Sequence, residues 1–455
     1  MTTTLVAPAV RLAEAWVDTS HIVVAGSAIS SVSSGQAPLG GATRLSGPVI
    51  PAIPNLHSHA FQRAIAGLTE VQSPTGDDFW SWRQAMYNSL AHLTPDDVRV
   101  IATQLYVEMV KAGYSRICEF QYLHNDIDGR PYAHAPAMSD ALVEAAKAAG
   151  IGLTLIPVLY TSSNFGGRPP EAGQRRFIQT LDQYMALVEH LRTRASDGSF
   201  EVGIGFHSLR AATPDQMRAV LAIDDRMPVH MHIAEQTKEV DDSLAWSGKR
   251  PVDWLAGEFE IDQRWCLVHA THMTDSEAKT AADSGATVSL CPTTEGNLGD
   301  GFFNADVYFE AGGRWGVGSD SHVGIDPREE LRLLEYGRRL QRRRRALSAS
   351  QGQPNVGAWL WMQAAGAAGP TGTRAGAIEA GQRADFIVLD PDHPQLVARS
   401  GDALIDSLVF VNVGGSPIRE VWIGGRRVVA EGRHPVEAEA RRAYAKVIAR
   451  LRDAA

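Results

Sequence analysis

Four short stretches of the sequence carry imidazole or carboxylate side chains whose types and spacing suit metal binding. They are His57-Ser58-His59, His232-Ile233-Ala234-Glu235, His269, and Gly318-Ser319-Asp320-Ser321. Imidazoles and carboxylates are good ligands for first-row metals, zinc among them. A metal ion with an open coordination position lowers the pKa of a bound water to roughly 7 and so supplies hydroxide at neutral pH. The chemistry that this set indicates is hydrolysis.

Taken singly, each of these motifs is weak evidence. The chain has 15 histidines in 455 residues, so a pair spaced like His57 and His59 is expected by chance in about half of such chains. We interpret His230 as a hydrogen-bonded barrel residue and not as a ligand. The combination is the stronger signal, because the four stretches end four separate apolar runs of the chain.

The elements that must position these residues are eight apolar runs between about residues 49 and 322, separated by amphipathic stretches. Runs that are apolar throughout are typical of strands buried on both faces of a parallel sheet. Eight such β-α units favour a TIM (β/α)8 barrel, and a doubly wound open sheet is the alternative that alternation leaves open. The active site of a barrel lies at the carboxyl ends of its strands. The four stretches end the first, fifth, sixth and eighth strands.

Local capping signals support the helices between these strands. Three helices are expected to begin with a threonine cap and an early acid, at Thr94-Pro95-Asp96, Thr213-Pro214-Asp215 and Thr274-Asp275-Ser276. A glycine just before the next strand is a favourable left-handed cap for a helix end. Glycines of this kind stand at Gly113, Gly150, Gly285 and Gly313.

The flanks of the barrel are organised differently. Residues 1–48 contain short alternating strands, and a second β-rich region spans residues 368–435. We expect these two segments to fold together as one small β-sandwich domain, with residues 49–367 forming the barrel. Residues 436–455 predict a terminal amphipathic helix. The arginine run within residues 339–345 is interpreted as a solvated helix face.

Composition restricts the partners of the chain. The net charge is −9, from 43 basic and 52 acidic residues; this disfavours nucleic acid, and an anionic substrate would need a local cationic pocket. Three widely spaced cysteines argue against a disulfide framework and suit a reducing cytoplasm. The sequence has no basic leader and no apolar run of about 20 residues, so we expect a cytoplasmic protein without a membrane partner.

The donor residues can be given roles. We assign His57, His59, His232 and Asp320 as metal ligands, which leaves one position open for water. Glu235 lies where the fifth strand gives way to a loop and is placed to shuttle protons. The second, third and fourth strands contain no lysine that could bridge a second metal. We therefore expect one divalent metal ion, zinc.

With these motifs in this order, the chain resembles the amidohydrolase superfamily along almost its whole length. The mononuclear deaminase branch of that superfamily carries H-x-H, H-x-A-E, a histidine after the sixth strand and an aspartate after the eighth. Residues 376–390, GAIEAGQRADFIVLD, are similar to its C-terminal β segment. The resemblance implies a metal-dependent enzyme that hydrolyses a carbon–nitrogen bond, and enzymes of this family are often homodimers.

Further stretches make the chain similar to the formimidoylglutamate deiminases of that branch. These enzymes convert N-formimino-L-glutamate to N-formyl-L-glutamate and ammonia in histidine degradation. The stretches are His57-Ser58-His59-Ala60-Phe61-Gln62-Arg63, Asp78-Phe79-Trp80-Ser81-Trp82-Arg83, Phe206-His207-Ser208-Leu209-Arg210 and His232-Ile233-Ala234-Glu235-Gln236. One alternative is another deaminase of the branch, acting on guanine or an S-adenosylhomocysteine-like nucleoside. A remote alternative is a non-catalytic barrel scaffold.

A dicarboxylate substrate needs fixed donors in this acidic protein, and arginine binds carboxylate through a planar fork. By resemblance, five residues bind the substrate: Tyr122, Arg210, Gln62, His207 and Arg83. Arg83 lies in an aromatic segment, so an alternative role is to stack on Trp80 or Trp82. The alternative for Tyr122 is a structural place on the barrel rim.

The mechanism that follows is attack of metal-bound hydroxide on the formimino carbon. Glu235 carries a proton from water to the imine nitrogen. Asp320 and His269 orient the hydroxide and stabilise the tetrahedral intermediate, which then expels ammonia.

Overall fold

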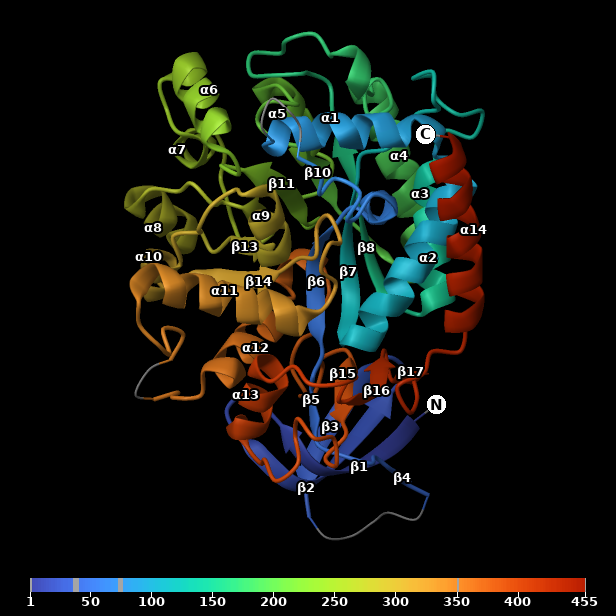
Figure 1. Ribbon diagram of the computed structural model, residues 1–455, viewed down its shortest axis with the longest axis vertical. Coiled ribbons are helices and arrows are strands. Elements are labelled where there is room, and N and C mark those ends of the chain that lie inside the picture. The colour runs from blue at the N-terminus through green and yellow to red at the C-terminus, as the bar shows by residue number, and fades with distance from the viewer. Residues whose placement is uncertain (1, 36–40, 73–76, 350–351, 455) are drawn as a thin grey trace.

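The computed structural model describes residues 2–35, 41–72, 77–349 and 352–454 of the chain. Ala455, the last residue of the predicted terminal helix, lies outside this part. The chain forms a large barrel and a smaller sheet, which lies below the barrel in Figure 1.

The barrel wall consists of eight parallel strands in sequence order, with the short β9 (Glu201–Val202) beside the third. The eight are β6 (Ile53–Ser58), β7 (Tyr114–Gln121), β8 (Gly152–Leu159), β10 (Ile204–Phe206), β11 (Val229–Ile233), β12 (Trp265–His269), β13 (Thr287–Leu290) and β14 (Arg314–Val317). A parallel bridge between Ser58 and Asp320 joins the first strand to the segment after the last. An open doubly wound sheet keeps its two edges apart, so this contact excludes it and confirms the TIM barrel.

Helices follow the strands and cover the outside of the wall (Figure 1). Those between β6 and the end of the barrel are α1 (Phe79–Ser89), α2 (Pro95–Ala112), α3 (Ala137–Ala149), α4 (Leu181–Arg194), α5 (Pro214–Leu221), α6 (Thr237–Ser247), α7 (Pro251–Glu258), α8 (Asp275–Asp283), α9 (Pro292–Leu298), α10 (Ala305–Glu310), α11 (Pro327–Arg342) and α12 (Val356–Gly366). The described residues also contain five short 3-10 helices: η1 (Ala60–Ala64), η2 (Leu90–His92), η3 (Ala172–Gln174), η4 (Ala195–Asp197) and η5 (Gly369–Thr371).

The three predicted threonine caps are confirmed. Thr94, Thr213 and Thr274 each accept a hydrogen bond from the backbone N–H three residues later, and each forms a reciprocal capping box. Such caps satisfy backbone donors that a helix start leaves unpaired. The prediction for Gly313 is wrong, because the residue with the left-handed backbone is its neighbour Gly312, at a φ of 74°.

The N- and C-terminal segments share one sheet of eight strands, as expected of segments that fold together. Its strands are β1 (Thr2–Arg11), β2 (Trp16–Ala25), β3 (Ala28–Ser34), β4 (Thr43–Arg44), β5 (Val49–Pro51), β15 (Phe386–Leu389), β16 (Ile418–Ile423) and β17 (Arg426–Val429). β5 pairs with β1 on one side and β15 on the other, so it joins the two terminal segments. Only one residue then separates β5 from β6, so the sheet leads directly into the barrel.

Two helices lie in the C-terminal part of the chain. α13 (Asp402–Phe410) falls inside the region predicted to be β-rich, and its Leu404, Ile405, Leu408 and Val409 are buried. This spacing is that of one helix face, which a search for short strands overlooks. α14 (Glu437–Ala454) runs along α2 (Figure 1), where Lys111 pairs with Glu437 and Arg450 pairs with Asp97.

None of the described helices is both long enough and apolar enough to cross a membrane.

One buried histidine makes the stability of the barrel depend on pH. His124, just beyond β7, bonds through Nε2 to the Val158 carbonyl at 2.9 Å, and burial lowers its pKa to about 4. In the unfolded chain it takes up a proton below its usual pKa of roughly 6.5. The stabilisation is therefore complete above pH 6.5 and is lost as the pH falls towards 4.

This gives a stability prediction. Between pH 7 and pH 4.5, we expect the free energy of unfolding of the wild type to fall on the order of 2 kcal/mol more than that of His124→Gln. Urea titrations at the two pH values measure the difference. Parallel losses in both proteins would show that His124 is not the titrating group.

Candidate active site

The predicted metal-binding residues gather at the carboxyl end of the barrel wall. His57 lies at the end of β6 and His59 just beyond it, His232 lies in β11, His269 ends β12, and Asp320 follows β14. The backbones of His269 and Asp320 lie in the left-handed region, with φ of 67° and 45°. Such strain in non-glycine residues persists only where the surroundings hold it, and it clusters at functional sites.

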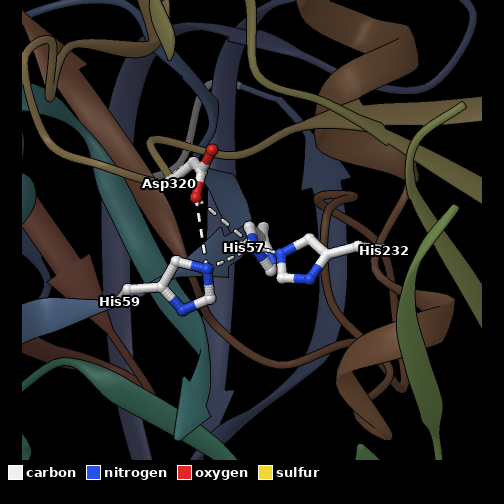
Figure 2. Close-up of side chains that lie close together, drawn as sticks. All are labelled: His57, His59, His232 and Asp320. Atoms are coloured by element: carbon white, nitrogen blue, oxygen red, sulfur yellow. Dashed lines mark hydrogen bonds and ion pairs between the residues drawn. The ribbon is translucent and has the colours of Figure 1, made fainter. Parts of the chain in front are cut away.

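Four side chains converge there on one point (Figure 2). The His57 Nε2 atom lies 3.0 Å from Nε2 of His59 and 2.9 Å from Nε2 of His232. Asp320 Oδ1 lies 3.3 Å from the His59 Nε2 and 3.5 Å from the His57 Nε2. All four residues are buried. One ligand atom from each of them therefore faces the same small volume.

The hydrogen bonds of the outer ring nitrogens show what this volume is suited to hold. Nδ1 of His59 lies 2.9 Å from the Phe120 carbonyl, and Nδ1 of His232 lies 2.8 Å from the His207 carbonyl. A carbonyl only accepts, so both Nδ1 atoms carry hydrogen, and in neutral rings both Nε2 atoms present lone pairs. Converging lone pairs beside a carboxylate repel one another until a cation lies between them. The donor set therefore fits a divalent metal ion, and the carbonyls fix its ligands from behind.

Burial reinforces this donor character. It lowers the pKa of His57 and of His232 well below the usual value, and neighbouring histidines lower each further. Burial also lowers the pKa of His59, although Asp320 opposes it. The three imidazoles are neutral at physiological pH, the form in which histidine binds metal.

Glu235 and His269 form the second part of the site. The His269 Nε2 lies 3.7 Å from Glu235 Oε1 and 3.7 Å from Asp320 Oδ2, and its Nδ1 lies 3.3 Å from Glu295 Oε1. Burial raises the pKa of Glu235 to about 7, and Asp320 adds to this while His269 opposes it. Burial alone would lower the pKa of His269, but the carboxylates around it raise the value to about 10. Glu235 is thus a carboxyl group able to gain and lose a proton near neutral pH.

All five residues expected to bind substrate line one pocket with the metal-donor group. They are Gln62, Arg83, Tyr122, His207 and Arg210. Gln62 donates through Nε2 to the Tyr122 hydroxyl at 2.8 Å, while its own Oε1 is buried without a partner among the described residues. His207 Nδ1 is likewise buried and unpartnered within the described part of the chain. The pocket therefore holds polar atoms that a ligand can satisfy.

Arg210 is the most informative of the five. It is 7% exposed, and its Nε has no hydrogen-bond partner in the described part of the chain. No carboxylate of the described residues lies within 4.0 Å of its guanidinium nitrogens. Its guanidinium carbon lies 5.7 Å from the Trp80 ring centroid, a contact that does not neutralise its charge. A buried cation without a countercharge is costly, so such groups are paired or bind an anion. The pocket is built for a ligand with negative charge.

The contacts of Arg83, His230 and the arginine run bear on the roles expected for them. The Arg83 guanidinium carbon lies 4.6 Å from the Trp80 ring centroid, so Arg83 stacks on Trp80 while it also lines the pocket. His230 lies 2.8 Å from the Pro370 carbonyl through Nε2 and takes no place in the donor group, in agreement with its interpretation as a barrel residue. Within the arginine run, Arg339 pairs with Glu335 and Arg342 with Asp306.

Three residues at the site were missed in the sequence. Glu295 orients His269 from α9, Tyr160 lines the pocket from the end of β8, and Glu119 lies fully buried behind the H-x-H segment. Glu119 accepts from Ser58 Oγ at 2.6 Å, the Ala60 N–H at 2.7 Å and the Tyr106 hydroxyl at 3.0 Å. A lone carboxylate inside an apolar strand was the available signal for Glu119. Nothing local marks the other two.

Two further groups of possible metal donors occur among the described residues. One joins His269 and Glu295 to Cys291, directly beside the site described above. The other lies at the surface and joins His134 and His190 to Asp140, whose carboxylate is already paired with Arg194.

A closed parallel barrel with three histidines and one aspartate at its carboxyl end defines a class of metal-dependent hydrolases. The sequence profile of the amidohydrolase family matches residues 49–428, and the chain belongs to this family. It is 48% identical over 444 residues to the formimidoylglutamate deiminase of Pseudomonas aeruginosa, with 97% of this chain and 98% of the relative covered.

The chain is also similar to a second curated enzyme and to a solved structure. A 5-methylthioadenosine/S-adenosylhomocysteine deaminase of Natronomonas pharaonis is 28% identical, with 88% of this chain and 87% of the relative covered. The crystal structure of an amidohydrolase from Brucella melitensis superposes with a TM-score of 0.94 at 42% identity, covering 99% of both chains. The whole chain, and not the barrel alone, therefore has counterparts.

Proposed function

We propose that the protein hydrolyses N-formimino-L-glutamate to N-formyl-L-glutamate and ammonia, with one zinc ion held by His57, His59, His232 and Asp320. The observation that carries this proposal is Arg210, a buried guanidinium without an ion pair among the described residues, in the same pocket as the metal-donor group. The deiminase from Pseudomonas aeruginosa supports the choice of substrate. A neutral nucleoside would leave Arg210 without an anion.

When bound, the metal ion supplies the Lewis acidity that makes water a nucleophile at neutral pH. The chain's own residues do the rest. Glu235 accepts a proton from the attacking water and delivers it to the imine nitrogen. His269 donates to the oxygen that gains charge, and Asp320 orients the water. A carbon–oxygen bond forms, and the second proton of the former water then moves from its hydroxyl oxygen through Glu235 to the same nitrogen. The bond from carbon to that nitrogen breaks, the carbonyl of the product forms, and ammonia leaves.

The two carboxylates of the substrate bind to the hydrogen-bond donors on the pocket wall. Arg210 and Arg83 supply guanidinium groups, and Tyr122, Gln62 and His207 supply neutral polar atoms. Charge-assisted hydrogen bonds of this kind are about twice as strong as neutral ones. The same contacts fix the distance of the formimino carbon from Glu235, which also lines the pocket.

Ammonia release by the zinc-loaded protein tests this proposal. N-Formimino-L-glutamate is compared with guanine and S-adenosylhomocysteine under the same conditions. We expect turnover of the first alone. Turnover of a heterocycle without turnover of N-formimino-L-glutamate would keep the hydrolase and overturn the substrate.

Glu119 gives a prediction for metal affinity. Its carboxylate fixes the segment between His57 and His59 through Ser58 and Ala60. In Glu119→Gln, an amide nitrogen faces one of these donors, so the two imidazoles lose their fixed orientation. We expect zinc affinity to fall by about 10- to 100-fold, measured by competition with a chelating dye. Tyr106→Phe removes only one donor and is the milder control; unchanged affinity in Glu119→Gln would contradict this role.

A further inference from the structure

Tyr160 is a pocket residue to which the proposed mechanism gives no task. It follows β8 directly, is 4% exposed and lines the pocket with Arg83 and Arg210. Its ring packs against His207, with centroids 4.6 Å apart. A tyrosine in such a place buries its ring and leaves its hydroxyl to a polar partner.

The orientation of the hydroxyl is fixed by Gln174. The Glu171 N–H donates to Oε1 of Gln174 at 2.8 Å, which turns the amide nitrogen towards Tyr160. That nitrogen donates to the Tyr160 hydroxyl oxygen at 2.8 Å. An amide N–H only donates, so the oxygen of Tyr160 accepts and its own hydrogen remains to be donated elsewhere. Gln62 donates to the Tyr122 hydroxyl in the same sense, although its own Oε1 has no partner among the described residues.

The backbone around Gln174 is built to hold this geometry. Gln174 is fully buried in η3, which packs on α1 through Gly173. A Cβ at Gly173 would lie 2.7 Å from Cδ2 of Tyr87, so a larger residue would force η3 or the Tyr87 ring to move. Tyr87, from α1, is a neighbour of Tyr160 and raises its pKa. The Tyr160 hydroxyl is thus oriented by η3 and lies near α1 at the pocket wall.

The ring contacts show that Tyr160 lies further from the metal-donor group than Tyr122 does. Tyr122 touches His59, with centroids 4.9 Å apart, and the next ring along is His207, at 5.3 Å from Tyr122. Tyr160 comes after His207 in this series. Consistently, Asp320 is among the charges that act on the Tyr122 pKa, whereas Arg210 and Arg83 act on that of Tyr160.

The role that we infer for Tyr160 from these contacts rests on the proposed function. N-Formimino-L-glutamate has one carboxylate beside the nitrogen that bears the formimino group and a second one two methylene groups further away. We propose that Tyr160, positioned by Gln174, donates its hydroxyl hydrogen to the second carboxylate, beside the guanidinium groups of Arg83 and Arg210. Tyr160 is then a specificity residue that selects the acidic side chain of the substrate.

Two substrates separate this role from a structural one. N-Formimino-L-norvaline has a methyl group in place of the second carboxylate and is otherwise the same. For Tyr160→Phe we expect kcat/KM on N-formimino-L-glutamate to fall about tenfold or more, mainly through KM. On the norvaline compound, kcat/KM should change less than about twofold. The matched acids N-formyl-L-glutamate and N-formyl-L-norvaline, compared as inhibitors, give the same ratio where turnover is slow.

Two variants serve as controls. Tyr184→Phe removes another fully buried hydroxyl, which donates to the Pro157 carbonyl away from the pocket, and it should leave substrate preference unchanged. Gln174→Met keeps Tyr160 and should shift the preference in the same direction by a smaller factor. Circular dichroism shows whether each variant folds.

The outcomes are distinguishable. Equal losses on both substrates, or no loss on N-formimino-L-glutamate, would overturn the role of Tyr160 while leaving the proposed function in place. A wild-type enzyme without activity on N-formimino-L-glutamate would overturn the proposed function itself.

Discussion

Replacing Glu235 with glutamine is expected to lower kcat by about 10²- to 10⁴-fold with the metal content unchanged. The amide has nearly the same shape but cannot accept the proton of the attacking water. Burial and Asp320 raise the pKa of Glu235 to about 7, so the carboxyl group is poised to accept and release a proton in the same cycle. No other carboxylate in the described part of the pocket wall, apart from the ligand Asp320, could replace it.

The measurement is steady-state kcat together with zinc content by elemental analysis. Glu277→Gln is the matched control, because Glu277 is also a fully buried carboxylate but caps α8 away from the pocket. Near-wild-type kcat in metal-replete Glu235→Gln would falsify the assignment of the proton shuttle.

Replacing Arg210 with methionine should lower kcat/KM for N-formimino-L-glutamate by at least about 30-fold, the equivalent of about 2 kcal/mol. Methionine keeps the length and the apolar stem of the side chain but removes the charge. Because Arg210 forms no ion pair within 4.0 Å in the described part of the chain, its removal breaks no direct contact with a protein carboxylate. Its charge lowers the pKa of Glu235 and of Glu239, so the variant and the wild type are compared at the pH optimum of each.

Arg218→Met is the control for Arg210→Met, since Arg218 is a half-exposed arginine of α5 that pairs with Asp215 and Glu258. Its kinetics should match those of the wild type. A deaminase of neutral heterocycles would tolerate Arg210→Met, so unchanged turnover in that variant would argue for such a substrate.

The sequence was sufficient for features that are encoded locally. Apolar runs predicted the barrel strands, and the threonine caps at Thr94, Thr213 and Thr274 were found because a cap depends on residues within one turn. α13 was missed because its helical face is short and lies between β-like segments. Gly312 and Gly313 are adjacent, and spacing alone did not distinguish which of them has the left-handed backbone.

The same contrast holds within the site. The proximity of the histidines and Asp320 could be predicted because each lies at the end of a strand. A barrel places all those ends at one rim. Glu295 and Tyr160 reach the site through tertiary packing, which no spacing in the chain records. The hydrogen bonds that fix the imidazoles come from the carbonyls of Phe120 and His207, and a backbone carbonyl has no signature in a sequence.

The most direct test of the proposed function is to follow the formimino carbon itself. The tetrahedral intermediate has two carbon–nitrogen bonds, and expulsion of ammonia or of glutamate leads to different products. With N-formimino-L-glutamate carrying ¹³C at that carbon, nuclear magnetic resonance of the zinc-loaded reaction should show the label in N-formyl-L-glutamate, with one ammonia released for each molecule formed. Label in formamide with free glutamate, or label that stays in the unreacted substrate, would contradict the account.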